Sequence, residues 1–296
     1  MSRCVVVDMA SSSEAILGDL KDNDIHTVFR YYASGFQPSL PEKRLTRSEA
    51  DALLDGGFSI GVVYQFNNNQ FANMNAARGR SDAEFAIEYA QSEMDQPEGS
   101  AIYFGVDGDW WTNSQQERVE EYFEAINEVF ADNGNPYLIG VYGSGKTCQN
   151  LGTANLASLF WLPLSTGWSL TREYFNSGEW SFYQNYHGLN IGGRYTDTNI
   201  INPAVNFIGT YNANGVVTAV SQPPSVFSDR RFVEASALNL RKQPDQSSAK
   251  IGSLRNRQNV RVLEDLGDWV RVDVNEDGIA DGYCSASYLV SLEQMP

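Results

Sequence analysis

The sequence has few of the residues that build metal centres and disulfide frameworks. It contains three cysteines (Cys4, Cys148 and Cys284) and two histidines (His26 and His187) among 296 residues. The cysteines are odd in number and far apart, so they indicate neither a set of disulfides nor a Cys-x-x-Cys metal site. Two histidines are too few for a histidine-rich metal centre. We therefore expect no obligatory cofactor, and we interpret each histidine as a structural or surface residue.

Long apolar runs are also missing near the start of the chain. The first one, Cys4–Val7, is too short for the apolar part of a signal peptide or for a membrane span. We therefore expect a protein that is synthesised in the cytoplasm without a signal peptide and does not insert into a membrane. An extracellular role would then require phage lysis or a specialised secretion system.

Positive charge is scarce. The chain has 21 lysine and arginine residues against 37 aspartate and glutamate residues, a net charge of −16. The imbalance lies in residues 1–222, which hold 12 basic and 26 acidic residues. Such a negative field repels nucleic acid and anionic membranes, so a nucleic-acid partner is excluded.

The first 200 residues alternate short apolar runs with helical patterns, which indicates repeated strand–helix units. The runs are rich in β-branched and aromatic residues, as in parallel strands buried on both faces. They lie at residues 4–8, 27–31, 60–64, 101–107, 137–142, 159–163 and 180–184. Capping-box signatures predict helix starts at Ser11, Thr46, Ser81 and Ser114. Such α/β units form a doubly wound sheet or a closed barrel. Seven candidate strands favour a TIM-like βα barrel over residues 1–220.

The pattern changes after the segment Ser221–Ser225, which contains two consecutive prolines and marks a linker at 221–230. Short strands and turns follow, and they predict a small all-β module over residues 231–296. Its candidate strands lie at 238–241, 249–254, 260–263, 269–274 and 283–290.

Carboxylates follow or end several of the candidate strands. Asp8 ends the first strand, Asp107 and Asp109 come at the end of the fourth, and Asp197 follows a glycine pair late in the barrel. The carboxyl ends of barrel strands share one mouth, where catalytic groups lie. Carboxylates gathered there repel each other, so at least one should keep its proton near neutral pH. One acid and one anion is what glycosidic cleavage requires. The alternative is that these residues cap the following helices.

Aromatic residues accompany the acids. Trp110 and Trp111 directly follow the acidic pair, where they could form a platform for the apolar face of a sugar or pack between loops. Arg30 is assigned to the same substrate-binding set, with Asp8 expected as its buried partner. Other residues in or at the ends of strands are predicted to line the cleft or fill the barrel: Tyr64, Tyr142, Trp161, Trp180 and Gln184.

Residues Gly140–Thr147 match the P-loop pattern, which raises the alternative of an ATP-dependent phosphotransferase. The context argues against it. The apolar run continues through Gly140 to Tyr142, whereas a P-loop strand ends at its first glycine. No later apolar strand ends in an aspartate suited to bind magnesium.

The ordered motifs of residues 3–205 carry a resemblance. They are an Asp ending the first strand, an Asp-x-Asp pair at the end of "IYFGV", and then "GVYG", "FWLPLS", "WSFYQ" and "DTN". The set resembles the barrel of glycoside hydrolase family 25 lysozymes, and more closely a related glycoside-hydrolase-like domain of unassigned function in bacterial cell-wall proteins. The resemblance implies that Asp109 is the catalytic acid, that Asp107 orients the substrate or stabilises charge, and that Asp8 and Asp197 complete the set. The lysozymes have Glu at the position of Asp109, and this departure favours either a different substrate geometry or a barrel that binds glycan without cutting it.

The C-terminal module carries a second resemblance. Its segments "LNLRKQPD", "GDWVRV" and "DGYCSASYLV" resemble bacterial SH3 domains, which in cell-wall enzymes bind peptidoglycan or its stem peptides. The alternative is a packing module without a ligand. Four residues copy the first ligand positions of a calcium loop: Asp273, Asn275, Asp277 and Asp281. Cys284 replaces the final Glu, which excludes an EF-hand. The alternatives are a calcium-binding half-loop or a polar turn.

These features together predict a peptidoglycan-degrading glycoside hydrolase of the lysozyme type with a wall-binding SH3-like module. It would be a phage endolysin or a secreted antibacterial effector. The expected partners are peptidoglycan glycan strands and stem peptides, with an immunity protein if the chain is a toxin. The alternative is a non-catalytic peptidoglycan-binding protein with a degenerate barrel. Asp109→Asn is expected to abolish lysis of cell walls without unfolding the chain.

Overall fold

The computed structural model describes residues 5–202, 204–219, 230–274 and 280–291. The chain forms two compact units, Met1–Pro223 and Pro224–Pro296. Within the described ranges, no helix has both the length and the apolar character needed to cross a membrane.

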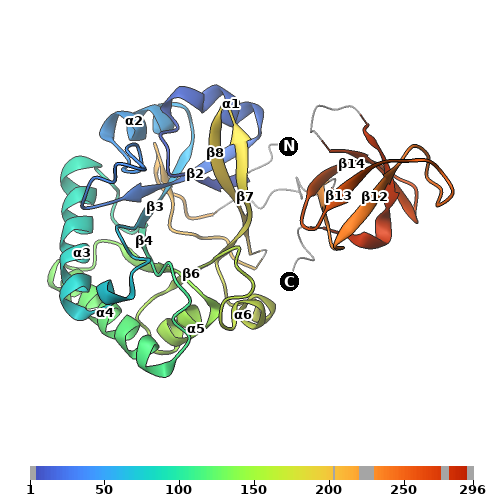
Figure 1. Ribbon diagram of the computed structural model, residues 1–296. Helices are drawn as coiled ribbons and strands as arrows, with labels where there is room; N and C mark the ends of the chain where they lie inside the picture. Colours follow the sequence, from blue (N-terminus) through green and yellow to red (C-terminus); the bar gives the residue numbers. More distant parts are fainter. Residues whose placement is uncertain (1–4, 203, 220–229, 275–279, 292–296) are drawn as a thin grey trace. The chain divides into compact units, whose positions relative to one another are not determined.

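The first unit contains the predicted α/β barrel (Figure 1). Strands β1–β7 pair in parallel around it, and the β3–β4 pairing closes the sheet. β8 lies antiparallel between β7 and β1. The bounds are β1 (Val5–Asp8), β2 (Ile25–Tyr32), β3 (Ser59–Tyr64), β4 (Ala101–Gly105), β5 (Leu138–Tyr142), β6 (Leu159–Leu162), β7 (Phe182–Ile191) and β8 (Arg194–Ile201).

Strand β8 has no counterpart among the seven predicted strands. It is mostly polar (RYTDTNII) instead of forming an apolar run, and it returns from β7 through the turn at Gly192 and Gly193, both at positive φ. An antiparallel strand needs only such a tight turn, whereas the parallel strands need a crossover. The small strands β9 (Tyr211–Asn212) and β10 (Gly215–Val216) extend the sheet beside β3.

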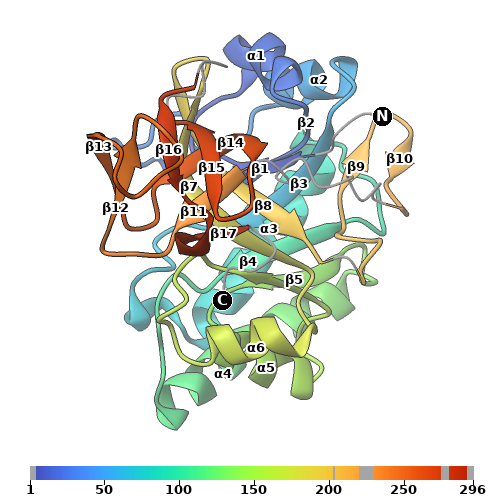
Figure 2. The same ribbon diagram turned by 90° about the vertical axis from the view of Figure 1, so that its right-hand side faces the viewer.

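Helices surround the barrel strands: α1 (Leu17–Asp22), α2 (Arg47–Asp55), α3 (Ala76–Glu88), α4 (Asn113–Asp132), α5 (Gly145–Thr153) and α6 (Thr171–Ser177). Figure 2 shows α1 and α2 on one side of the strands and α5 and α6 on the opposite side. Single turns complete the set: η1 (Glu14–Ile16), η2 (Phe71–Asn73) and the π-turn η3 (Tyr89–Glu93); a further turn, η4 (Ala286–Tyr288), belongs to the second unit.

The predicted helix starts are only partly correct. The Thr46 hydroxyl caps α2 by accepting from the Glu49 amide at 3.3 Å. Helix α3 starts earlier than expected, after Asn75, and Ser81 therefore lies inside it. Helix α4 starts after Thr112, whose capping box leaves Ser114 within the first turn. Several side chains near each start can act as caps, and the end of the preceding loop decides which one does.

Aromatic side chains fill the barrel interior. Trp161 stacks on Phe182 with ring centroids 4.7 Å apart, and Phe29 lies 4.8 Å from Phe182. Gly61 on β3 makes room for this packing, because a Cβ there would lie 2.4 Å from the Phe29 ring. The interior is therefore a packed core below the mouth of the barrel.

The second unit is all-β, as predicted. Its sheet has the order β13-β12-β16-β15-β14-β11-β17 and encloses a small apolar core that includes Leu238, Val260 and Val272. The strands are β11 (Arg230–Val233), β12 (Ala237–Arg241), β13 (Lys250–Arg255), β14 (Asn259–Asp265), β15 (Trp269–Asp273), β16 (Gly282–Ser285) and β17 (Leu289–Ser291).

Two of the four predicted calcium ligands fall within the described residues. Asp273 is fully buried, and the Asp281 carboxylate accepts from the Val274 amide at 2.7 Å. Asn275 and Asp277 lie outside the described residues. Elsewhere, the described residues hold no cluster of three or more metal-binding side chains. Calcium binding by this loop stays a prediction.

Candidate functional site

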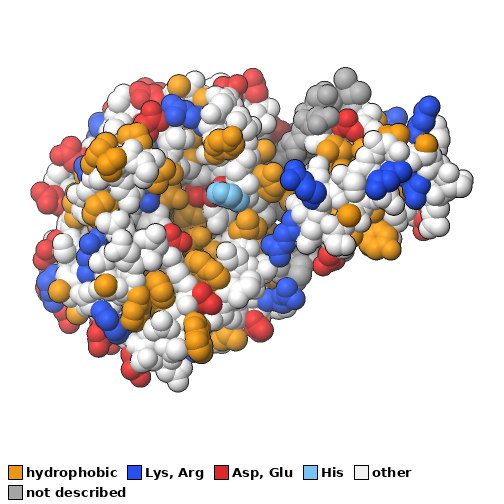
Figure 3. Space-filling model, in the orientation of Figure 1, with side chains coloured by type: hydrophobic (Ala, Val, Ile, Leu, Met, Phe, Trp, Pro, Cys, Tyr) orange, Lys and Arg blue, Asp and Glu red, His pale blue; other side chains and the backbone are white. Residues whose placement is uncertain are grey.

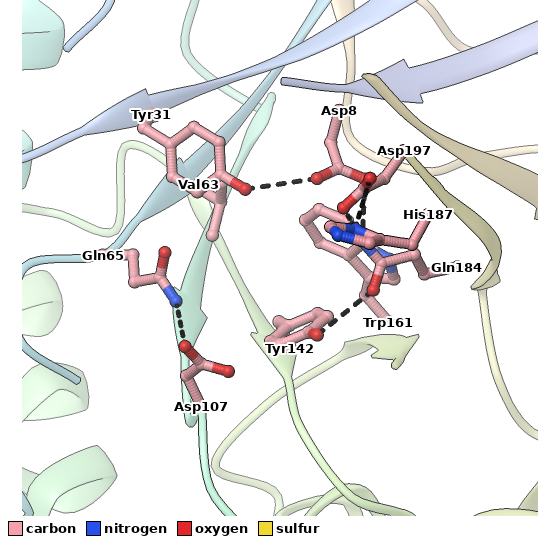
Figure 4. Close-up of a pocket in the computed structure, with 10 residues that line it drawn as sticks. All are labelled: Asp8, Tyr31, Val63, Gln65, Asp107, Tyr142, Trp161, Gln184, His187 and Asp197. Atoms are coloured by element: carbon pink, nitrogen blue, oxygen red, sulfur yellow. Dashed lines mark hydrogen bonds and ion pairs between the residues drawn. The ribbon is translucent and has the colours of Figure 1, made fainter. Parts of the chain in front are cut away.

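A cavity of about 290 Å³ opens at the carboxyl ends of the barrel strands. Figure 3 shows this face hollowed, with acidic side chains and a histidine at the hollow. Strands β1 to β8 each contribute at least one lining residue, either within the strand or just after it: Asp8, Tyr31, Val63, Gln65, Asp107, Tyr142, Trp161, Gln184, His187 and Asp197. In Figure 4, Asp8 and Asp197 lie on one side of the cavity and Asp107 with Gln65 on the other.

Asp8 and Asp197 are brought together by the pairing of β1 with β8, in which they are direct partners. The Gln184 amide connects them, since its Nε2 donates to Asp197 Oδ2 at 2.8 Å and to Asp8 Oδ2 at 3.4 Å. Asp197 Oδ1 also accepts from the Gly188 amide at 2.9 Å and lies 2.7 Å from Nδ1 of His187. The two carboxylates thus share one donor in a confined site.

The environment of Asp8 favours its protonated form. Burial is the largest cause, and the negative charge of Asp197 adds to it, so the pKa of Asp8 rises from 3.8 to about 7. Hydrogen bonds from Asn199 (2.8 Å), Tyr31 (3.2 Å) and Gln184 act in the opposite direction. Asp8 is therefore a carboxyl group that can hold or release a proton near neutral pH, as a general acid requires.

Asp107 lies in a different environment. Its Oδ2 accepts from Gln65 Nε2 at 3.0 Å, and Gln65 Oε1 in turn accepts from Lys43 Nζ at 2.7 Å. Burial raises the pKa of Asp107, while the charge of Lys43 and the Gln65 hydrogen bond lower it. The cavity therefore places a carboxyl group that is connected to Lys43 opposite a carboxyl pair whose partners are amides, the Tyr31 hydroxyl and His187.

Tyr142 and Gln184, which were assigned to substrate binding from the sequence, also line the cavity. The Tyr142 hydroxyl donates to Gln184 Oε1 at 3.3 Å, which helps to orient the amide between the two acids. Below them, Trp161 Nε1 donates to Asn199 Oδ1 at 2.8 Å, so that the Asn199 amide faces Asp8. These contacts fix the donors around the acidic pair.

Asp109, the residue to which the resemblance assigned the catalytic acid, is not among the residues that line this cavity. Its Oδ1 accepts from the backbone amide of Ser169 at 2.9 Å, which ties the loop after β4 to the loop after β6. Trp110 is half-buried against Phe71, with ring centroids 5.2 Å apart. Trp111 is 64% exposed. Neither tryptophan lines the cavity, although Trp111 is accessible to a ligand.

The predicted Arg30–Asp8 pair is wrong. Arg30 is fully buried and pairs with Glu49 of α2 at 2.7 Å, on the helix-facing side of β2. Successive residues of a strand point to opposite faces, and Tyr31 is the one that reaches Asp8.

Tyr64 and Trp180 also lie away from the cavity. The Tyr64 hydroxyl donates to Asp82 of α3 at 2.6 Å, and Trp180 stacks on Phe175 of α6 at 4.8 Å. Their assignment to the cleft is therefore not supported by their positions, because both pack between a strand and a helix.

Several lining or supporting residues were absent from the sequence-based set: Tyr31, Val63, Gln65, His187, Asn199 and Lys43. The sequence offers a signal for one of them, because Gln65 directly follows a strand. Lys43 lies in a loop without any motif, and His187 belongs to an unforeseen extension of β7.

The P-loop pattern does not form a phosphate site. The Gly145 amide donates to Thr171 Oγ1 at 3.0 Å, and the Lys146 amide donates to the Ser169 carbonyl at 2.8 Å. The Lys146 ammonium donates to the Trp111 carbonyl at 2.8 Å. The groups that would hold a phosphate are thus used within the barrel.

Comparison with known proteins places both units. A model of the Rv2525c-like, glycoside hydrolase-like domain matches residues 18–208, and a model of the bacterial SH3 domain matches residues 236–290. Two uncharacterized proteins of Bacillus subtilis (strain 168), YbfG and FadG, are 30% and 29% identical over 177 and 155 residues. These alignments cover 57% and 52% of this chain but 24% and 27% of the relatives, so the chain spans about a quarter of their length.

Solved structures share the barrel fold. The crystal structure of the Mycobacterium tuberculosis Tat-secreted protein Rv2525c with L-tartrate has a TM-score of 0.57 at 20% identity, covering 71% of this chain and 99% of that one. A structure of an uncharacterized B. stearothermophilus protein has a TM-score of 0.50 at 15% identity, covering 68% and 97%. At these identities the likeness shows the fold alone.

Proposed function

This chain belongs to the Rv2525c-like family of glycoside hydrolase-like domains and carries a bacterial SH3 domain, and from this premise we propose that it is a glycosidase that cleaves peptidoglycan. The observation that carries the proposal is the acidic cavity. It combines Asp8, whose pKa is about 7, with the neighbouring Asp197 and with Asp107 across the cavity. A carboxylic acid and a carboxylate on either side of a sugar are the groups that glycosidic cleavage uses.

The proposed reaction begins with Asp8 protonated. Its proton passes to the glycosidic oxygen while the bond from that oxygen to the anomeric carbon breaks, and the electron pair stays on the leaving oxygen. Asp107 stabilises the positive charge that develops on the sugar, or orients its acetamido group. Water then adds its hydroxyl to the anomeric carbon and returns a proton to Asp8. Asp197 and Gln184 keep the pKa of Asp8 in the working range.

Asp109 remains the rival proton donor, on the strength of the family resemblance. The test compares Asp8→Asn, Asp107→Asn and Asp109→Asn on purified sacculi, with mass spectrometry of the released fragments. We expect the first two to lower the release of reducing ends by at least 100-fold, since Asp8→Asn removes the proton donor and Asp107→Asn removes the carboxylate that stabilises the developing positive charge. If Asp109→Asn loses activity while Asp8→Asn retains it, the proton donor is Asp109 instead.

The second unit offers a binding site for the same polymer. A groove of about 330 Å³ is lined by aromatic and polar side chains, among them Trp269, Tyr288 and Arg241. Tyr288 is 51% exposed and thus available to a ligand. We assign this groove to stem peptides of the wall, where it would raise the local concentration of the barrel on its substrate.

A second candidate function is a wall-binding protein without catalysis. One observation favours it: the acid at the family's catalytic position is the shorter Asp109, and its carboxylate is held by the Ser169 amide outside the cavity. Binding of the full chain to sacculi without any release of reducing ends, at every pH between 4 and 8, would select this function over the first.

The place of action follows from the substrate. We propose that the chain acts on the cell wall after phage lysis or specialised secretion, as an endolysin or an antibacterial effector. The relative Rv2525c is described as Tat-secreted, which is consistent with a role of such barrels outside the cytoplasm. An effector that acts on the producer's own type of wall would require an immunity protein, and co-purification from the producing cells would reveal it.

A further inference from the structure

Lys43 is a buried cation directly behind the cavity. It is 7% exposed, and its Nζ lies 4.7 Å from the centroid of the Tyr31 ring. The same Nζ donates to Gln65 Oε1 at 2.7 Å, and Gln65 Nε2 donates to Asp107 Oδ2 at 3.0 Å. Lys43 does not line the cavity itself, but it is connected to a lining carboxylate through a single amide.

The chemistry of these three groups allows one arrangement. An ammonium group can only donate hydrogen bonds, so the Gln65 amide must turn its oxygen toward Lys43. Its NH₂ group then faces Asp107, which as a carboxylate can only accept. A neutral side chain at position 43 would remove this constraint, and the amide could then turn its oxygen toward a protonated Asp107.

We propose that Lys43 is a positioning residue: its ammonium group fixes the orientation of the Gln65 amide, and this amide holds the Asp107 carboxylate in the cavity. The inference deepens the proposed function and rests on it for its consequence in catalysis. The contacts themselves involve no substrate.

The fold holds Lys43 in place through the loop between β2 and α2. The Leu45 amide donates to the Tyr31 carbonyl at 2.9 Å, and Arg30 Nη2 donates to the Glu42 carbonyl at 2.8 Å. Arg30 is in turn fixed by its pair with Glu49. The buried ion pair therefore supports the loop from outside the barrel, and the loop delivers the ammonium group to the inside.

The charges agree with this arrangement. Burial is the largest cause that lowers the pKa of Lys43 to about 8; the charge of Asp107 opposes it, and the charge of Arg30 adds to it. Lys43 is thus still mainly charged at neutral pH. Its charge in turn lowers the pKa of Asp107, which burial raises. Loss of the charge should therefore favour protonation of Asp107.

The test is an NMR titration of the Asp107 side chain in the full chain, which needs no activity. In Lys43→Met we expect the pKa of Asp107 to rise by about one unit or more, the usual effect of removing a close opposite charge. Lys43→Arg keeps the charge and should stay nearer the wild type. Lys21→Met, the same change at an exposed site of α1, is the matched control. Gln65→Leu removes the amide while leaving the cation, and it should also raise the pKa of Asp107.

An unchanged Asp107 titration in folded Lys43→Met would overturn the proposal. If that variant does not fold, Gln65→Leu decides, and an unchanged Asp107 pKa there has the same meaning. An inactive wild type on sacculi would reject the proposed glycosidase while leaving the titration valid. If the wild type is active, Lys43→Met should lower kcat more than it changes KM, because substrate does not touch Lys43.

Discussion

The difference in stability between Asp8→Asn and the wild type should shift in favour of the variant as the pH rises. Asp8 is 3% exposed and its pKa is raised from 3.8 to about 7. Between these two values the folded protein retains a proton that the unfolded chain releases. Wild-type stability therefore falls as the pH rises from about 4 to about 7. The amide of Asn does not ionise, so the variant lacks this loss.

The size of the effect follows from the pKa difference. Each pKa unit corresponds to about 1.4 kcal/mol of unfolding free energy. The wild type therefore loses about 4 kcal/mol of stability over the whole pH range and about 3 kcal/mol between pH 5 and pH 8. The substitution preserves the local contacts, since the amide oxygen can accept from Asn199 and Gln184 while the NH₂ group donates to the Tyr31 hydroxyl. For a domain of this size, about 3 kcal/mol corresponds to about 5–10 °C in Tm.

Calorimetry of the full chain measures this effect. The Tm difference between Asp8→Asn and the wild type should grow in favour of the variant by about 5–10 °C from pH 5 to pH 8. Asp132→Asn, a change of the same type at an exposed position of α4, should show no such trend. A Tm difference that is equal at both pH values would refute the reasoning, since it would mean that Asp8 ionises as readily in the folded state as in the unfolded chain.

The other two predictions concern the buried ion pair and the second unit. Arg30→Met leaves the 1% exposed Glu49 without its cation and should lower the free energy of unfolding, measured with denaturant, by about 3–5 kcal/mol. The additional change Glu49→Leu should restore much of this stability. A loss below about 1 kcal/mol for Arg30→Met would contradict the burial of this charge. Trp269→Ala, which removes an aromatic wall of the groove, should reduce retention on sacculi about 10-fold or more while leaving the barrel transition unchanged. Ile251→Ala on β13, at a 51% exposed position outside the groove, is its control, and equal retention of both variants would place the binding site elsewhere.

Sequence reasoning reached those parts of the site that depend on the ends of strands. Asp8 and Asp107 could be assigned because each comes at or just after the end of an apolar run, and the carboxyl ends of parallel strands meet at one mouth. Tyr142 and Gln184 lie at the ends of the predicted strands 137–142 and 180–184, and both line the cavity. Asp197 was found through its motif, although the strand that carries it was not.

Sequence reasoning failed where the direction of a side chain mattered. Strand β2 is buried on both faces, so its sequence does not show whether Arg30 or Tyr31 points into the barrel, and the choice made for Arg30 was wrong. The same ambiguity misplaced Tyr64, which packs against α3, whereas Trp180 lies before the start of β7 and packs against α6. Asp109 follows Asp107 by two residues, and the path of the backbone through Gly108 decides which carboxylate reaches the cavity.

By itself the sequence determined the two units, the alternation of strands and helices in the first, the all-β character of the second, and a group of acids at the barrel mouth. Short-range patterns suffice for these features, because periodicity and strand ends are local properties of the chain. Only the tertiary structure decided that Asp197 pairs with Asp8, that Arg30 belongs to Glu49, and that Lys43 reaches Asp107 through Gln65. Each of these contacts joins separate elements, so it depends on the register of strands and the path of loops, which no local pattern encodes.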